Sequence, residues 1–308
     1  MDNEQGARPL GRREDASRPG SRPSFFENYT IEATPSEVLQ SKTGLADLPE
    51  QTKVYIPLLP RNSFDDTVQA AKALRREDLV PVPHVTARTL KDAAQLADRL
   101  KRLSDECGVD EILLLAGGDA RATGAFQNTL EILGTGVLER SGLARIGFAG
   151  HPEGHSDVSG SDLEKALQAK NEFARASGIA CYLVTQFFFD AAPVLAWERG
   201  LRALGIQLPV HPGIHGLAGV PSLIRHAVAC GVGASLKALR SSSPGLLQLA
   251  GRRDPSGLVS AIVEARASDP DSLFEQLHFF PLGAFERTVE YANALPAQIG
   301  RSVLTAES

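Results

Sequence analysis

Short runs of β-forming residues alternate with longer helix-like segments along this chain, and this alternation constrains the fold more than any other feature. The runs are rich in Val, Ile, Leu and aromatic residues, and the segments between them carry apolar residues at helical spacing. Strands separated by helices favour a parallel sheet, because a parallel connection has to cross over the sheet. We count eight such strands, at residues 29–33, 53–59, 80–85, 111–116, 145–149, 181–186, 208–214 and 276–281.

Eight strands with intervening helices predict a closed (β/α)8 barrel, with an open doubly wound sheet as the alternative. Helices are expected after the caps Ser63, Thr89 and Ser161. The roughly sixty residues between the last two strands are too many for one crossover, so extra helices are expected there. Residues 1–23 are rich in Arg, Gly, Pro and Asp and predict a flexible tail, which leaves residues 24–308 as a single domain.

Charge and composition argue against several classes of partner. The 308 residues include 32 basic and 37 acidic side chains, a net charge of -5, which gives no reason to expect nucleic acid or an anionic membrane. No run approaches the roughly 18 apolar residues of a membrane span, and the amino end lacks the apolar core of a signal peptide. Three scattered cysteines indicate neither a disulfide framework nor a zinc knuckle. We therefore expect a cytoplasmic protein.

Polar side chains follow most of the predicted strands. In a barrel of parallel strands, the residues just after each strand face the active site. These positions hold Glu32, His84, Thr86, Gly117-Gly118-Asp119, residues 151–155, Gln186 and residues 211–215. The sequence therefore predicts a site at this end of the barrel.

Two carboxylates in this set admit both a functional and a structural interpretation. Glu32 lies between apolar neighbours, which can raise its pKa enough for general acid catalysis near neutral pH. A solvated glutamate at a strand end is the commoner case, and position alone favours it. Asp119 follows two glycines that let the backbone approach a flat ligand, but it could equally cap the next helix.

Two His-x-x-x-His stretches, His151 to His155 and His211 to His215, suggest a metal site, and Glu153 lies within the first. Four histidines and a carboxylate could hold zinc in a metal-dependent barrel hydrolase. That spacing forms one ligand face only on a helix, and the prolines and glycines inside both stretches argue against helix. We therefore expect no metal ligands here. Neither a Gly-x-Gly-x-x-Gly turn nor a P-loop is present, so barrel loops would have to hold any nucleotide cofactor.

Residues 185–190 read Thr-Gln-Phe-Phe-Phe-Asp, a concentration of aromatic side chains in a chain with only 6% aromatic residues. Five other stretches accompany it in a recognisable order: 83–86, Gly118-Asp119, 151–155, 212–214 and 278–282. Together they resemble the methylenetetrahydrofolate reductase family, which is a family of flavin-dependent (β/α)8 barrels. The resemblance extends over residues 28–295, and the hexapeptide is its most specific part.

The resemblance implies a bound FAD that is reduced by NADH or NADPH and reduces 5,10-methylenetetrahydrofolate to 5-methyltetrahydrofolate. Reversal of that reaction in demethylation catabolism is a variant. Glu32 would donate the proton that opens the folate ring, and Asp119 would hydrogen-bond the pterin beside the flavin. Folate contacts would also come from Gln186, Phe188 and Leu282. FAD contacts would come from His84, Gly118, Asp119, His151, His155 and Lys170.

Several positions depart from the family pattern. The aromatic neighbours of the glutamate are replaced by Ile31 and Ala33, and Gly117 stands where bacterial members often carry arginine. The resemblance thus implies a divergent bacterial member restricted to the catalytic domain, acting as a homo-oligomer in one-carbon metabolism and methionine biosynthesis. Besides the metal-dependent hydrolase, a barrel that binds folate or flavin without full activity is the alternative.

Overall fold

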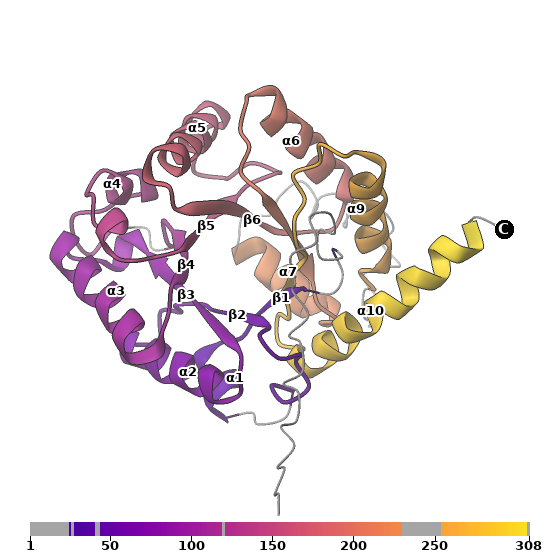
Figure 1. The fold of residues 1–308 in the computed structure, drawn as a ribbon, viewed down its shortest axis with the longest axis horizontal. Coiled ribbons are helices and arrows are strands. Elements are labelled where there is room, and N and C mark those ends of the chain that lie inside the picture. The colour runs from indigo at the N-terminus through magenta and orange to yellow at the C-terminus, as the bar shows by residue number, and fades with distance from the viewer. Residues whose placement is uncertain (1–24, 26–27, 41–43, 119–120, 230–253, 307–308) are drawn as a thin grey trace, which may run out of the picture.

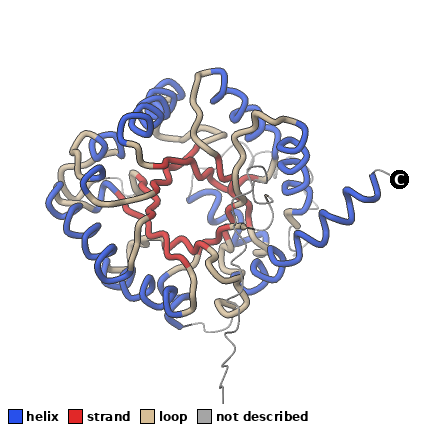
Figure 2. The backbone as a smooth tube through the Cα atoms, viewed as in Figure 1, coloured by secondary structure: helices blue, strands red, loops and turns tan. Residues whose placement is uncertain are grey.

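The computed structural model describes residues 25, 28–40, 44–118, 121–229 and 254–306. Within them, eight parallel strands close into a barrel in chain order from β1 to β8 (Figure 1). Figure 2 shows the ring of strands enclosed by helices. The (β/α)8 barrel predicted from the sequence is confirmed, and the predicted tail at residues 1–23 lies outside the described residues.

All eight predicted strands are present, with changes at their ends. The strands are β1 Thr30–Glu32, β2 Lys53–Ile56, β3 Val80–Thr86, β4 Glu111–Leu115, β5 Arg145–Gly150, β6 Ala180–Phe188, β7 Val210–His215 and β8 His278–Phe280. The prediction that the second strand reaches residue 59 is wrong, because Pro57 has no N–H to continue the ladder. The sixth strand runs two residues beyond its predicted end.

Helices and short 3-10 turns connect the strands. They are α1 Pro35–Gln40, α2 Phe64–Arg76, η1 Ala87–Thr89, α3 Ala93–Cys107, α4 Thr129–Leu133, η2 Leu138–Arg140, α5 Gly160–Ser177, α6 Ala191–Ala203, α7 Val220–Ala229, α9 Ser256–Ser268 and α10 Phe285–Ala306. Both α7 and α9 lie between β7 and β8, which confirms the prediction of extra helices there. Among the described residues, none of the helices combines the length and the apolar character needed to cross a bilayer.

One of the three predicted caps is confirmed. Ser63 caps α2 and forms a reciprocal capping box with Asp66. The cap predicted at Ser161 is wrong, because Ser159 accepts the hydrogen bond that starts α5. The cap predicted at Thr89 is also wrong, since α3 starts after Asp92.

The error at Thr89 has a local cause. Its hydroxyl donates to the Thr86 carbonyl at 2.9 Å and closes the 3-10 turn η1. Ser and Thr side chains often choose such local backbone partners over a helix cap. Asp92 then accepts from the Gln95 N–H at 2.8 Å and begins the helix three residues later.

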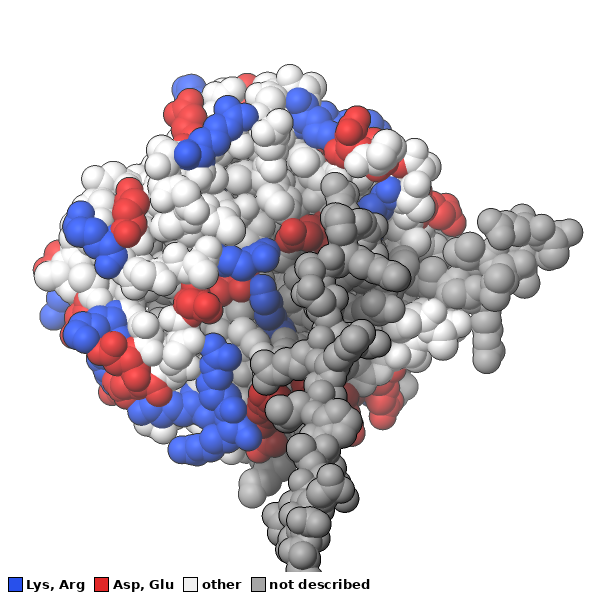
Figure 3. Space-filling view, viewed as in Figure 1, with Lys and Arg blue, Asp and Glu red and all other residues white. Residues whose placement is uncertain are grey.

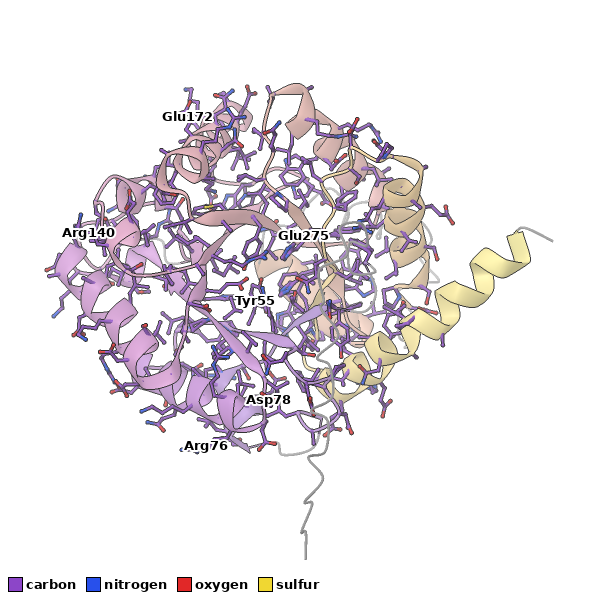
Figure 4. The ribbon with its side chains drawn as sticks, viewed as in Figure 1. Tyr55, Arg76, Asp78, Arg140, Glu172 and Glu275 are labelled. Carbon is purple, nitrogen blue, oxygen red and sulfur yellow. The ribbon has the colours of Figure 1, made fainter. Side chains whose placement is uncertain are left out.

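The barrel has an apolar exterior and an interior in which polar and apolar side chains are mixed. Strand side chains that point outward, such as Ile31, Ile56 and Leu114, pack with the helices in the main hydrophobic cluster. Inside, Tyr55 and Tyr182 occupy places that most such barrels fill with branched apolar residues, and their hydroxyls lie 2.6 Å apart. Figure 4 shows Tyr55 near the middle of the ring, with Arg140 at its periphery. On the face seen in Figure 3, basic and acidic side chains are interspersed.

Gly147 in β5 gives Tyr182 its space, since a Cβ there would lie 2.7 Å from the ring Cζ. We predict that Gly147→Ala lowers the free energy of unfolding by about 1–3 kcal/mol, as overpacking does. Urea denaturation measures the change. Gly200→Ala in α6 is the control, because its added Cβ meets nothing within 4 Å and should stabilise the helix. Equal effects of the two substitutions would contradict the prediction.

Candidate functional site

The residues predicted to form a site gather at the carboxyl ends of the strands. Glu32 is the last residue of β1, and His84 lies near the end of β3. His151 directly follows β5, and Gln186 lies near the end of β6. Because all strands of a parallel barrel end at the same face, one end of the molecule holds these groups. Asp119 lies outside the described residues.

Glu32 lies between two imidazole rings. Its Oε1 is 3.4 Å from Nε2 of His84 and 4.0 Å from Nε2 of His278 on β8. Neither nitrogen has a hydrogen-bond partner among the described residues. Nδ1 of His278 lies 2.7 Å from the Thr30 hydroxyl, which fixes the orientation of that ring. Sequence analysis assigned no role to His278, although a histidine near the start of the predicted strand that closes the barrel beside β1 was a usable signal.

All three groups are neutral near pH 7. Burial, and then repulsion from Glu37, raises the pKa of Glu32 to about 8. Burial lowers the pKa of His84 to about 3 and holds the pKa of His278 well below its ordinary value. The contacts are therefore not ion pairs. A protonated carboxyl that keeps 19% of its side-chain surface exposed is suited to giving a proton to a bound molecule.

Three basic residues gather at the carboxyl end of β5. The rings of His151 and His155 meet edge to face with centroids 5.3 Å apart. Lys170 of α5 is 6% exposed, and its ammonium lies 5.4 Å from the centroid of the Phe148 ring. Burial, and then repulsion by Lys170 and His155, lowers the pKa of His151 to about 4.

Lys170 carries a buried charge for which the described residues supply no counter-ion. Burial lowers its pKa to about 8, so the ammonium is still mostly charged at pH 7. Within the described residues, no carboxylate forms an ion pair with it. Because an uncompensated buried ammonium is costly, this cluster is suited to holding an anionic group of a ligand.

Arg88 supplies a cation beside the turn that follows β4. Its Nη1 donates to the Gly117 carbonyl at 3.2 Å, and its Nε donates to the Gln127 carbonyl at 3.0 Å. Gly117 has a φ of 100°, which glycine adopts at little cost. A Cβ on Gly118 would meet nothing within 4 Å. Sequence reasoning missed Arg88, although it lies two residues beyond the end of β3.

A bulge in β6 positions Gln186. Three residue steps from Val184 to Phe187 match two steps from His211 to Gly213 on β7, so β6 contains one extra residue. The Thr185 hydroxyl bridges the bulge: it donates to the Gln186 carbonyl at 2.8 Å and accepts from the Gly213 N–H at 2.8 Å. The sequence predicted Gln186 at a strand end but did not predict this irregularity.

The bulge also decides which phenylalanine points inward. A shift of one residue exchanges the faces of a strand. Phe187 now pairs with Gly213 and joins a cluster with Leu282 at its edge, while its ring lies 5.9 Å from that of Phe280. Phe188 pairs with Ile214 and packs in the outer core at 1% exposure. The predicted substrate contact of Phe188 is therefore better suited to Phe187 or Phe280.

Leu282 has a backbone conformation that bulky residues seldom adopt, with a φ of 52°. The Ser222 hydroxyl donates to its carbonyl at 2.8 Å, and Gly283 follows with a φ of 88°. Such positions persist where the surroundings hold them, and they gather at ligand sites. The substrate contact predicted for Leu282 stays a prediction.

The two His-x-x-x-His stretches do not meet. His211 reaches Glu275 at the amino end of the barrel, whereas the His215 ring contacts Phe189 just beyond β6. The other pair follows β5, and β6 separates it from β7. Over the part of the chain that the structure describes, no group of three or more His, Cys, Asp or Glu side chains is arranged to hold a metal ion.

A cavity of about 630 Å³ lies at the opposite end of the barrel, lined by residues before or at the start of strands, including Lys53, Arg145 and Glu275. We assign the candidate site to the carboxyl ends instead. The buried acid and the basic cluster lie there, and barrel enzymes carry out their chemistry at that face.

Fold and site together define a (β/α)8 barrel with a protonated acid and a buried cation at the carboxyl ends of its strands. The family model for methylenetetrahydrofolate reductase matches residues 61–237, more than half of the 308-residue chain. The protein therefore belongs to the methylenetetrahydrofolate reductase family. The match includes His84 and Gln186 but not Glu32 or Leu282, so the roles of the last two stay predictions from the resemblance.

Two yeast proteins are similar in sequence. Methylenetetrahydrofolate reductase 1 of Schizosaccharomyces pombe is 29% identical over 160 residues, which are 48% of this chain and 25% of that protein. Methylenetetrahydrofolate reductase 2 of Saccharomyces cerevisiae is 27% identical over 127 residues, 39% of this chain and 21% of that protein. The alignments thus span a quarter or less of these relatives.

A solved structure is similar in fold. It is an uncharacterized protein from Clostridium thermocellum that binds two copies of 5-methyl-5,6,7,8-tetrahydrofolic acid. The TM-score is 0.55 at 12% sequence identity, with 88% of this chain and 95% of that chain covered. At this identity the likeness supports the barrel fold.

Substitution of Thr185 tests whether its hydroxyl stabilises the bulge in β6. We predict that Thr185→Val lowers the free energy of unfolding by about 1–3 kcal/mol, because the Gly213 N–H loses its buried acceptor. Urea denaturation measures the loss. Thr67→Val is the matched control, since that hydroxyl is buried in α2 without a hydrogen-bond partner among the described residues. A loss of similar size in both variants would show that the bulge does not depend on the Thr185 bond.

Proposed function

We propose that this protein reduces 5,10-methylenetetrahydrofolate to 5-methyltetrahydrofolate, with FAD as cofactor and NADH or NADPH as hydride donor. The observation that carries the proposal is Glu32, a carboxyl with its pKa raised to about 8 at the carboxyl end of a barrel from this family. Reduction of the methylene group opens a five-membered ring, and the departing ring nitrogen needs a proton. A carboxyl that is protonated at neutral pH supplies it.

The residues at the end of β5 fit the anionic part of FAD. Lys170 would pair with a pyrophosphate oxygen, which gives its buried charge the counter-ion that the described residues do not provide. His151 and His155 would donate hydrogen bonds beside it, and the open backbone at Gly118 would admit a flat ring. FAD, when bound, would take hydride from the nicotinamide and deliver it to the folate.

The folate would lie against the apolar cluster of Phe187, Phe280 and Leu282, with the Gln186 side chain above the bulge as its polar contact. Asp119 is proposed, on family resemblance, to hydrogen-bond the pterin. The methyltetrahydrofolate bound by the Clostridium thermocellum barrel supports a tetrahydrofolate derivative as substrate. The homo-oligomeric state, cytoplasmic location, reverse direction in demethylation and single-domain boundary at residue 24 stay predictions.

Glu32→Gln tests the reductase directly. We predict that the variant still binds FAD and is reduced by NADH or NADPH at the normal rate. Its reoxidation by methylenetetrahydrofolate should slow by about 10²–10⁴-fold, because only that half-reaction needs a general acid. In the unsubstituted protein, the same rate should fall as pH rises above about 8, where Glu32 loses its proton.

Stopped-flow absorbance of the flavin follows both half-reactions separately. Equal slowing of the two would contradict the acid role of Glu32. A purified protein that binds flavin or folate, but whose reduced flavin never reacts with methylenetetrahydrofolate, would support the binding barrel instead. Stoichiometric zinc without flavin would support the hydrolase.

Lys170→Met tests the cofactor site. We predict that FAD binds at least about tenfold more weakly, the effect expected when a charged hydrogen-bond partner is lost. The stability of the FAD-free protein should stay equal or rise, because Met removes a buried charge of similar length. Lys165→Met on the exposed side of the same helix, with a side chain 73% exposed, is the control. Titration of the FAD-free protein measures affinity, and unchanged affinity in Lys170→Met would exclude this pyrophosphate contact.

A further inference from the structure

The proposed site uses only the carboxyl end of the barrel, yet polar groups continue through its interior to the other end. Lys53, Glu111 and Arg145 are the first residues of β2, β4 and β5, and both basic residues form ion pairs with Glu111. Glu275 pairs with Arg145 at 3.2 Å and is 44% exposed at the cavity there. This end of the barrel therefore has a charged and solvent-accessible mouth.

His211 is the first interior group above that mouth. Its Nε2 lies 2.9 Å from the Glu275 carboxylate, and its ring stacks on Tyr182 with centroids 4.4 Å apart. The side chain is fully buried, and Nδ1 has no hydrogen-bond partner among the described residues. One nitrogen thus contacts an exposed acid, while the other is available inside the barrel.

The two tyrosines continue from His211 toward Glu32. The Tyr182 hydroxyl lies 2.6 Å from the Tyr55 hydroxyl, and the Tyr55 ring meets His278 with centroids 4.6 Å apart. His278 in turn presents Nε2 to Glu32 at 4.0 Å. Burial is the main cause that raises the pKa of both tyrosines. The next cause is the charge of Glu111 for Tyr55 and the neighbouring Tyr55 for Tyr182, so both hydroxyls stay neutral.

The proposed reaction needs a proton supply. Hydride comes from the nicotinamide, and the ring nitrogen of the folate takes one proton, so each turnover consumes one proton. Glu32 holds a single proton and has to be recharged before the next turnover. The folate and the flavin would both lie at the carboxyl face, which restricts access of water from that side.

We propose that the column Glu275, His211, Tyr182, Tyr55 and His278 carries protons through the barrel axis from the amino-end mouth to Glu32. This inference rests on the proposed function and extends it. At each step an O–H or N–H bond breaks as a new one forms on the next group, and no electrons are transferred.

His211 accepts a proton on Nε2 and releases one from Nδ1, and the two hydroxyls each accept one proton and donate another. Nε2 of His278, whose Nδ1 bonds the Thr30 hydroxyl, takes a proton from the Tyr55 hydroxyl through one water and then gives that proton to the Glu32 carboxylate. Buried polar nitrogens without a protein partner are where folded proteins hold ordered water. One water at Nδ1 of His211 and one at Nε2 of His278 would complete the chain.

The groups that face Glu32 are consistent with delivery of a proton to its carboxylate along this column. They are His84 from β3, His278 from β8, Glu37 from α1 and Tyr55 at the paired position on β2. None of these is a cation near pH 7, so a deprotonated Glu32 gains no counter-ion and readily takes a proton. A purely structural interior would be filled more cheaply by apolar side chains, since buried polar groups without partners cost free energy.

The test compares first and later turnovers. The variants are His211→Phe, which keeps an aromatic ring to stack on Tyr182, and Glu275→Gln, which removes the acid at the mouth without substituting a residue inside the barrel. Tyr29→Phe is the control, because Tyr29 is a buried tyrosine whose hydroxyl bonds Asn293 outside the barrel. We expect the first reoxidation of the reduced flavin to stay within about twofold of normal in both variants, since Glu32 starts out protonated.

Steady-state turnover should fall about tenfold or more in both relay variants, and its solvent deuterium isotope effect should increase, because recharging Glu32 becomes limiting. The control should change in neither respect. Normal steady-state rates in both relay variants would overturn the proposal, as would slowing of the first turnover or slowing without a larger isotope effect.

A second measurement does not depend on turnover. The infrared C=O stretch of the protonated Glu32 carboxyl, identified by its loss in Glu32→Gln, shifts when deuterium replaces the proton. After mixing with D2O, we expect this shift to be slower in His211→Phe than in Tyr29→Phe. Equal rates would overturn the relay even if the protein reduced no folate, while failure of folate to reoxidise the unsubstituted protein would overturn only the proposed function.

Discussion

Closure of the barrel between β8 and β1 is the constraint on which the rest of the structure depends. The pairing of Thr30 with His278 joins positions almost at opposite ends of the described chain. It sets His278 beside Glu32 and lets the Thr30 hydroxyl orient the imidazole. Without closure, Glu32 would end an edge strand in contact with water, and its pKa would stay near that of an ordinary carboxyl.

Side chains that point outward from the strands and side chains that point inward contribute differently to the protein. Outward side chains such as Ile31 and Leu114 bury apolar surface against the helices, which supplies most of the driving force for folding. That large outer core allows the interior to hold tyrosines, histidines and carboxylates that pack less favourably. Gly147 shows how closely the interior side chains pack, since its missing side chain leaves the space that the Tyr182 ring needs. The barrel interior therefore holds side chains that can accept and donate protons, as the proposed relay requires.

The bulge in β6 shows how local irregularity decides a site. Strict alternation from Val184 would put Gln186 and Phe188 on the inner face together, and the family resemblance implied folate contacts for both. One extra residue, held by the Thr185 hydroxyl, turns Phe187 inward and moves Phe188 into the outer core. Hydrogen bonds between strands remote in sequence determine this change, and a single sequence does not display them. The cap predicted at Thr89 failed for a different, local reason, because its hydroxyl donates to the Thr86 carbonyl three residues earlier.

The sequence by itself determined the alternation of strands and helices, the closed barrel and the family. It did so because periodicity and short motifs are local properties of the chain. It also gathered Glu32, His84, His151 and Gln186 at one face, since parallel strands share a direction. Only the tertiary structure decided that burial raises the pKa of Glu32 to about 8, that Lys170 is buried without a carboxylate partner among the described residues, and that tyrosines and histidines continue to the far mouth. Those properties arise from burial and from contacts between distant strands, and both exist only after the barrel has closed.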